Sequence, residues 1–188
     1  MRPLLSVGLV ALVGCATVLG PRSIEWNPID AQPSDTPAPV VEEGKLVLSG
    51  RAVRSQSAYT APVTIECEAQ PAEASTNSCF YIDLVPENQP TTQLPNEYLG
   101  IKLVHSGTLQ IWATRGGEPT YLIKPAAIRA DADGRYKIIV QARLDGIIVQ
   151  VNNETVRGDY PVPYGKFTIE LRTFPPPNPW RVDSFSVH

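Results

Sequence analysis

Apolar and polar residues alternate in short runs from Lys45 to the end of the chain. In VTIECEA, residues 63–69, the apolar side chains of Val63, Ile65 and Cys67 are separated by polar ones. This period of two places successive side chains on opposite faces of a β-strand, and no run sustains the 3.6-residue period of a helix. The pattern therefore predicts an all-β fold whose strands each have one face toward a core and one toward water.

The predicted strands are bounded by turn residues such as Gly, Asp, Asn and Pro. In chain order they span 45–50, 63–69, 80–85, 98–104, 108–114, 120–124, 136–144, 146–152, 166–173 and 180–187. Asp145-Gly146 predicts a type I′ hairpin, because both central positions of that turn need a positive φ. Val182 and Phe185 differ in parity, so the last strand requires a β-bulge near Asp183-Ser184. This number of strands in one short domain predicts a two-sheet antiparallel β-sandwich.

The first residues follow a different pattern. An apolar run over residues 3–13 follows Arg2; it is shorter than the about 20 residues that span a bilayer but long enough for a signal-peptide core. Leu12-Val13-Gly14-Cys15 resembles the bacterial lipobox. The resemblance implies a lipoprotein that is cut before Cys15 and carries a diacylglycerol and an acyl chain, such as palmitate, on that residue. Ala16, in place of an Asp that resembles an inner-membrane retention signal, favours the outer membrane if the cell is Gram-negative.

Residues 15–44 are rich in Pro, Ser, Asp and Glu, which predicts a disordered tether behind the lipid anchor. Within it, Trp26 has two possible roles, docking onto the domain or lying at the membrane interface. The predicted organisation is a signal peptide over 1–14, the lipidated N-terminus and tether over 15–44, and one β-sandwich domain over 45–188.

The last part of the chain contains three characteristic runs, YKIIVQARLDGIIVQVNNETV, GDYPVPYGKFTIELRT and WRVDSFSV, all within residues 136–188. Together they resemble the concanavalin A-like jelly roll. The relatives that they resemble are the 3-keto-disaccharide hydrolase-like and laminin G-like groups of bacterial domains. One departure is Asn152-Asn153-Glu154, which replaces the usual Asn-Gly turn. The resemblance implies a fold, and a fold does not by itself specify a function.

Charge and cysteine content narrow the chemistry. The net charge of −3 argues against a nucleic-acid partner, because binding phosphate groups needs clustered Lys and Arg. Cys67 and Cys79 form a candidate disulfide in an oxidising compartment, although alternation places Cys79 on the face of Asp83 and not on the core face. Two cysteines without a Cys/His cluster make no zinc site, so no metal site is predicted. Asp131-x-Asp133-Gly134 begins like a calcium loop but has no completing acidic ligand, so calcium is a minor alternative to an expectation of no cofactor.

Catalytic groups are few in the sequence. Glu66 and Glu68 lie on one face of a predicted strand with their Cα atoms about 7 Å apart, within the carboxylate spacing of an inverting glycosidase. The more ordinary interpretation is two glutamates on a wet strand face. His105 lies beside a predicted turn and His188 is terminal, so neither forms a triad with Ser and Asp. We therefore assign no catalytic residue and keep Glu66 and Glu68 as weak candidates.

Outward residues on two neighbouring predicted strands suggest a binding face instead. Tyr98, Lys102, Gln110 and Trp112 have the same parity, and a short turn makes their strands neighbours. Aromatic surface beside hydrogen-bonding groups suits a sugar, whereas a single Trp packed under a loop is the structural alternative. The expected function is an envelope lipoprotein that binds carbohydrate or an envelope partner without catalysis. A glycoside hydrolase acting on a sugar derivative and a purely structural envelope protein are the alternatives.

Overall fold

The computed structural model describes residues 24–29, 36–73, 77–90, 95–160, 162, 165–175 and 178–188. Within these residues there are strands and no helices. The strands are β1 (Trp26–Pro28), β2 (Val40–Glu42), β3 (Lys45–Leu48), β4 (Val53–Ser55), β5 (Val63–Pro71), β6 (Cys79–Pro86), β7 (Tyr98–Val104), β8 (Thr108–Arg115), β9 (Glu118–Tyr121), β10 (Ala126–Ala127), β11 (Tyr136–Ala142), β12 (Ile147–Val151), β13 (Glu154–Gly158), β14 (Phe167–Phe174) and β15 (Trp180–Val187).

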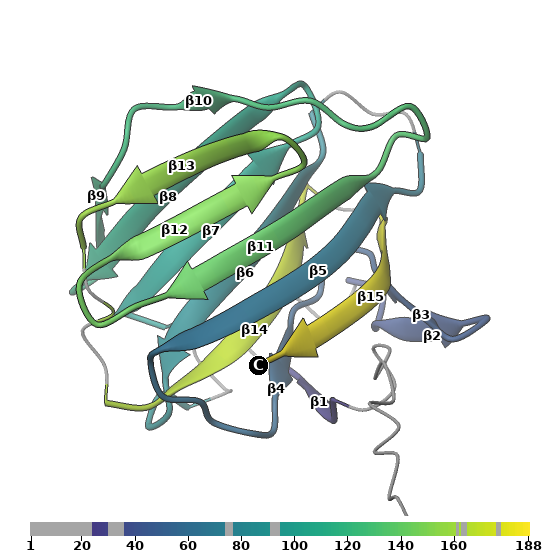
Figure 1. Cartoon of the computed structure of the whole chain (residues 1–188). Helices are drawn as coiled ribbons and strands as arrows, with labels where there is room; N and C mark the ends of the chain where they lie inside the picture. The colour runs from purple at the N-terminus through teal and green to yellow at the C-terminus, as the bar shows by residue number, and fades with distance from the viewer. Residues whose placement is uncertain are drawn as a thin grey trace, which may run out of the picture.

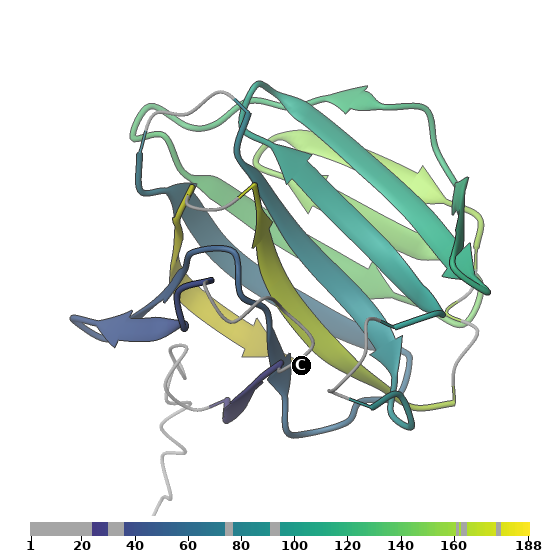
Figure 2. The same ribbon diagram turned by 180° about the vertical axis from the view of Figure 1, so that it is seen from behind.

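Two antiparallel sheets lie face to face. Sheet A has the order β1-β4-β14-β6-β7-β8-β10, with β9 also paired to β8, and sheet B has the order β13-β12-β11-β5-β15-β3-β2. Figure 1 shows sheet B in front, and Figure 2 shows sheet A from the opposite side. The expected two-sheet antiparallel β-sandwich is confirmed.

The inward residues of both sheets form one apolar core. On β5 the burial alternates strictly from Val63, so Ile65 and Cys67 face inward as the sequence predicts. Across the sandwich, the Phe80 ring of sheet A stacks on Trp180 of sheet B with ring centroids 5.3 Å apart. Such burial of apolar area is the dominant force holding the two sheets together.

The sequence predicted a bulge in the last strand and a type I′ turn at Asp145-Gly146, and the structure bears out only the bulge. The pairing of β15 with β5 shifts register between Val182 and Ser184, which confirms the predicted bulge. The type I′ turn was wrong, because neither Asp145 nor Gly146 has a positive φ. Ala142 pairs directly with Ile147, so the loop holds four residues and the hairpin does not need the positive φ values of a two-residue turn.

The described part of the expected tether belongs to the fold. Strand β1 pairs with β4 in sheet A, and β2 pairs with β3 in sheet B. Trp26 packs edge-on against Phe185 with ring centroids 5.2 Å apart, and Ile29 is fully buried. Trp26 therefore docks onto the domain, and the sandwich begins before residue 45. Cys15 and the predicted signal peptide lie outside the described residues.

The candidate disulfide is absent. Cys67 and Cys79 are free thiols, both buried. Cys67 faces the core from sheet B, whereas Cys79 belongs to a separate cluster with Tyr81 and Trp112 on the other side of sheet A. The sheet therefore stands between the two sulfur atoms. The parity of Cys79 in the sequence already pointed to this arrangement.

Candidate functional site

Side chains on the outer face of sheet A, which is turned away from the core, are buried along its central strand. All residues of the central strand β6 are buried, including Tyr81 and Asp83 on its outward side. The neighbouring strand β14 buries Glu170, which like Asp83 is only 1% exposed. Buried charged groups need partners, because removing a charge from water costs several kcal/mol. Their partners lie on the same face.

Four charged side chains form a ladder across β4, β14 and β6. Glu170 lies directly between Arg54 of β4 and Asp83 of β6 in the strand register. Arg54 Nη2 lies 3.0 Å from Glu170 Oε2, and Arg172 Nε lies 2.6 Å from Asp83 Oδ2. Arg54 also donates through Nη1 to the carbonyl oxygen of Gln89 at 2.7 Å. Each carboxylate thus has its own guanidinium, and the charges balance within the ladder when both acids are ionised.

Burial perturbs the acids of this ladder. Burial and then the neighbouring Asp83 carboxylate raise the pKa of Glu170 to about 7, although Arg54 opposes the shift. Burial also raises the pKa of Asp83, against the attraction of Arg172. Burial alone would lower the pKa of Arg172, but its contact with Asp83 raises that pKa, so the guanidinium stays charged. With a pKa of about 7, Glu170 changes protonation near neutral pH.

Three aromatic rings pack beside the ladder. The Trp112 indole lies across Gly100, where an added Cβ would come within 2.5 Å of Cζ2. Tyr81 and Tyr98 meet Trp112 edge-on, with centroids 6.1 and 6.2 Å away. The absence of a side chain at Gly100 thus lets the indole lie flat on the sheet. Trp112 forms part of the floor of this face.

A recess of about 280 Å³ opens between the ladder and the segment before β7. Its lining is Asp83, Pro95, Asn96, Tyr98, Thr114, Gly117, Glu170 and Arg172. Two buried polar atoms among these residues, Asp83 Oδ1 and Thr114 Oγ1, have no hydrogen-bond partner within the described ranges. An unpaired buried acceptor or hydroxyl costs about 1–3 kcal/mol, so each such atom in a recess is a candidate contact for a ligand.

A larger hollow of about 580 Å³ lies beside β1, β2 and β3. Apolar side chains dominate its lining, among them Ile24, Trp26 and Leu46, and Glu43 is its one charged residue. It lacks the facing charged groups of the recess. The recess is therefore the better candidate site despite its smaller volume.

The four residues predicted to share a face do lie together. Tyr98, Lys102, Gln110 and Trp112 are on the outer side of sheet A, with Lys102 directly opposite Gln110. Tyr98 is half-buried at the recess, whereas Trp112 is only 7% exposed. The indole is therefore no open platform for a ligand. Tyr98 is the aromatic residue of this set that lines the recess.

The carboxylates singled out from the sequence lie elsewhere. Glu66 and Glu68 are half-buried on the outer face of sheet B, and Glu68 lies 3.4 Å from Arg135. The sandwich thus separates them from the recess. The directly opposed carboxylates on the recess side are Asp83 and Glu170 instead.

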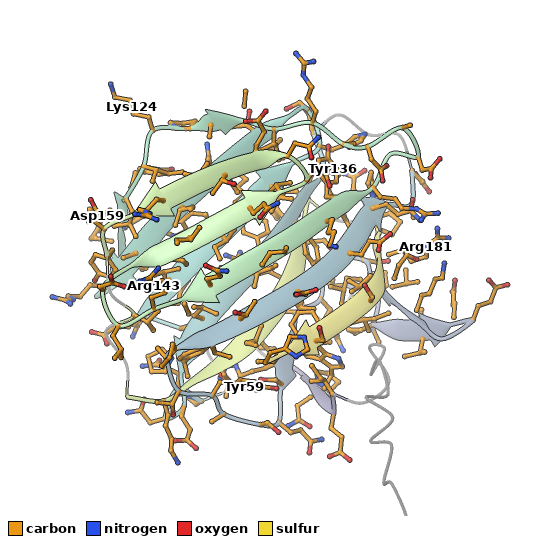
Figure 3. The ribbon with its side chains drawn as sticks, viewed as in Figure 1. Tyr59, Lys124, Tyr136, Arg143, Asp159 and Arg181 are labelled. Carbon is orange, nitrogen blue, oxygen red and sulfur yellow. The ribbon has the colours of Figure 1, made fainter. Side chains whose placement is uncertain are left out.

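The two histidines have local partners. His105 is within 3.2 Å of the Tyr136 hydroxyl, which lies at one end of the sandwich in Figure 3. His188 is 3.0 Å from Ser186 at the chain's end. Neither histidine lines the recess.

The possible calcium loop at Asp131 is an ordinary turn in the structure. Asp131 Oδ1 accepts hydrogen bonds from the backbone amides of Asp133 and Arg135, which is the geometry of an Asx turn. No group of three or more His, Cys, Asp or Glu side chains in the described ranges is placed to hold a metal ion. The same ranges hold no helix long and apolar enough to cross a bilayer.

Sequence reasoning missed Asp83, Glu170, Arg172 and Arg54. A signal for the first of them exists: in FYIDLV the outward positions include Tyr81 and Val85 beside Asp83. A strand that is apolar on both faces is typical of the covered centre of a sheet. An acid at such a position predicts a buried charge that requires a partner.

Comparisons with known proteins give matches only among solved structures. No protein-family model matches the chain, and no curated protein does. Carbohydrate-binding module CBM66 from Bacillus subtilis superposes with a TM-score of 0.65 at 7% identity, covering 87% of this chain and 94% of the module. A β-1,3-1,4-glucanase (lichenase) from a mouse hindgut metagenome gives 0.63 at 14% identity, covering 86% and 91%. An endo-acting O-glycanase structure from the human gut microbiota gives 0.64 at 12%, covering 92% and 95%.

These neighbours share one architecture. The chain has a concanavalin A-like jelly-roll fold. Jelly rolls of this kind include both a binding module and hydrolases among the matches, so the fold leaves the function open. The residues of the recess, and not the fold, therefore indicate the function.

Proposed function

We propose that the protein binds carbohydrate in the recess on the outer face of sheet A. The observation that carries the proposal is the pair of unpartnered buried polar atoms, Asp83 Oδ1 and Thr114 Oγ1, in a recess that Tyr98 also lines. Sugar hydroxyls donate to carboxylates and exchange hydrogen bonds with hydroxyl groups, and the apolar face of a sugar ring packs on an aromatic ring. The recess supplies all three kinds of contact.

Preorganisation also favours a binding role. Arg172 holds Asp83 at 2.6 Å, and Arg172 itself lies 4.0 Å from the centroid of the Tyr81 ring. Side chains fixed in this way lose little conformational entropy when a ligand arrives. Hydrogen-bonding groups held in place before binding are what a lectin-like site needs.

A glycan array screened with the full chain tests the proposal. The variants are Tyr98→Ala, at the recess, and Tyr121→Ala, an exposed tyrosine of β9 outside its lining. We expect at least one glycan to bind, and Tyr98→Ala to weaken that binding by about tenfold while Tyr121→Ala leaves it unchanged. No glycan bound, or equal losses in the two variants, would contradict a carbohydrate site in the recess. Absence of any glycan ligand would favour a protein partner or a structural role.

Hydrolysis of a glycoside is the second candidate function. It is favoured by the direct cross-strand pairing of Asp83 with Glu170 and by the pKa of Glu170, raised to about 7. Residues directly opposite on neighbouring strands have Cβ atoms about 4.5–5.5 Å apart, which suits a pair of catalytic carboxylates. Glu170 would be the general acid and Asp83 the partner carboxylate. Both are only 1% exposed and bound to arginines, so binding without catalysis remains our first proposal.

Incubation of the chain with each glycan that it binds tests this candidate. Release of a reducing end that Glu170→Gln abolishes, with binding retained, would establish hydrolysis. Glu66→Gln is the matched control on the opposite sheet. Unchanged glycans after long incubation would leave the recess a binding site only.

We also propose that Cys15 is lipidated and anchors the protein in the bacterial envelope. The proposal rests on Leu12-Val13-Gly14-Cys15 behind an apolar run. Two or more acyl chains together anchor a protein stably, whereas a single chain gives only marginal membrane binding. Metabolic labelling with palmitate should mark the chain, and Cys15→Ala should lose both the label and the membrane fraction. Label that persists in the variant would contradict the anchor.

A further inference from the structure

We infer that the sugar accommodated by the recess carries a carboxylate, which Arg172 binds and Lys102 attracts. This inference rests on the proposed carbohydrate site and names the class of its ligand. Its basis is the distribution of positive charge around the recess.

Arg172 has donors to spare. Among the described residues its guanidinium makes one hydrogen bond, from Nε to Asp83 Oδ2 at 2.6 Å. Both Nη groups therefore have no protein partner there, while Arg172 lines the recess and its side chain is 22% exposed. The fork of two Nη groups matches the two oxygen atoms of a carboxylate, and such bidentate pairs are among the strongest polar contacts in proteins.

The ring beneath Arg172 fixes the direction of its guanidinium. Arg172 Cζ lies 4.0 Å from the Tyr81 centroid and 5.9 Å from the Tyr98 centroid. The ion pair with Asp83 and the two tyrosines restrain the guanidinium, so little ordering is left for a ligand to impose. An acidic group that entered beside Tyr98 would meet a positioned cation.

Lys102 adds an unpaired positive charge beside the ladder. Its Nζ lies 5.7 Å from the same Tyr81 ring, and it forms no ion pair within the described part of the chain. Arg54 and Arg172 are each matched by a carboxylate, Glu170 and Asp83, so Lys102 gives these five side chains together a net positive charge. The chain as a whole carries a net charge of −3, so the local excess is opposite in sign to the molecule.

These features together specify a uronic or other carboxylated sugar. Its carboxylate would meet the Nη groups of Arg172, and a neighbouring hydroxyl would donate to the unpartnered Asp83 Oδ1. A neutral sugar would use the second contact and not the first. Charged ligands are therefore expected to bind more tightly than neutral ones of the same shape.

The test is a glycan array that pairs each uronate or sialate oligosaccharide with its carboxyl-reduced counterpart. We expect the acidic member to bind at least tenfold more tightly and to weaken as NaCl rises from 20 to 500 mM. Lys102→Gln should lower its affinity about threefold, and Arg172→Lys, which keeps the charge but loses the fork, about tenfold or more. Lys137→Gln, an exposed lysine on the opposite sheet, is the matched control and should have no effect.

The outcomes separate this inference from the proposed function. Reduced glycans that bind as tightly as their acidic partners, with Lys102→Gln equal to Lys137→Gln, would overturn the carboxylate and keep the carbohydrate site. No binding to any glycan would overturn both. Because Lys102 is only half-buried and forms no ion pair in the described residues, its variant reports on the ligand even if Arg172→Lys fails to fold.

Discussion

Two single polar atoms make the recess a candidate binding site. Asp83 Oδ1 and Thr114 Oγ1 are buried without a partner among the described residues, while Asp83 Oδ2 and Glu170 Oε2 accept hydrogen bonds from arginines. Leaving such an atom unpaired costs the desolvation of that atom and returns nothing to the folded chain. Thr114 is the cleaner of the two for experiment, because its side chain is neutral.

Replacing Thr114 with Val should therefore separate stability from function. Valine has nearly the shape of threonine and removes only the unpaired hydroxyl, so we expect the free energy of unfolding to stay constant or rise by up to about 1 kcal/mol. Affinity for the glycan identified on the array should fall about tenfold. Urea denaturation and calorimetric titration of the same samples measure the two effects. A loss of stability above about 1 kcal/mol would mean that the hydroxyl has a partner in the folded protein.

At the scale of the strands, pairing between β4, β14 and β6 brings the charged residues of the ladder together. Arg54, Glu170 and Asp83 come from positions far apart in the sequence and meet only through strand register. Burial makes the protonated form of Glu170 the preferred one up to a pKa of about 7. The unfolded chain has the ordinary value of 4.5, so the two states bind different numbers of protons between these pH values.

This difference predicts a pH-dependent contribution of Glu170 to stability. The folded chain holds the extra proton, so the contribution is fully present below about pH 4.5 and is lost as the pH rises through 7. At pH 5 the protonated side chain resembles glutamine, and Glu170→Gln should fold almost as well as the parent chain. From pH 5 to pH 8 the unfolding free energy of the parent, relative to the variant, should fall by roughly 2–3 kcal/mol.

Urea denaturation of both chains at the two pH values measures this contribution. Glu68→Gln, in an exposed ion pair on sheet B, is the control, and its difference should change by less than about 0.5 kcal/mol. A Glu170→Gln difference that is constant with pH would show that Glu170 is ionised throughout.

Strand β1 supports a second prediction at this scale. Trp26 packs against Phe185 and lines the hollow between β1 and β3, so Trp26→Ala should lower the free energy of unfolding by about 2–3 kcal/mol. Leu144→Ala is the control, because that leucine is 74% exposed in the loop between β11 and β12. Thermal unfolding of the two variants gives the comparison. Equal melting temperatures would mean that Trp26 belongs to a free tether.

Alternation predicted the long strands well because parity is a local property of the chain. Strands β5, β6, β7, β8, β11, β12, β14 and β15 were all expected within a few residues of their observed bounds. Strand β13, with the sequence ETVRG, was missed because a mostly exposed edge strand has no apolar stripe. Parity also placed Tyr98 and Lys102 on one face correctly. It could not name the partner of Asp83 on that face, because Arg172 comes from a distant part of the sequence.

At the scale of the whole molecule, apolar packing and a few side-chain hydrogen bonds, such as the one from Thr173 Oγ1 to the carbonyl oxygen of Leu48, join the two sheets within the described residues. The core side chains interdigitate, and Cys67 and Cys79 lie on opposite sides of sheet A as free thiols. Burial raises the pKa of both thiols, which keeps them protonated and unreactive in the folded state.

Alkylation with iodoacetamide should therefore depend on folding. We expect peptides carrying Cys67 and Cys79 to be unmodified after treatment of the native protein and fully modified in urea without reductant. Mass spectrometry of the digested protein gives both measurements, and the melting temperature should be the same with and without reductant. A linked peptide pair, or a lower melting temperature in reductant, would restore the disulfide.

The pairing of β1 with β4 sets a distance as well as a boundary. If the chain is lipidated at Cys15, the tether between the bilayer and the sandwich ends at Ile24, because Ile24 already packs against the core. That length of backbone reaches at most about 30 Å when fully extended. A carbohydrate-binding domain held in this way would reach only glycans that are attached close to the bilayer. Glycans in a thick outer coat would lie too far away to be bound.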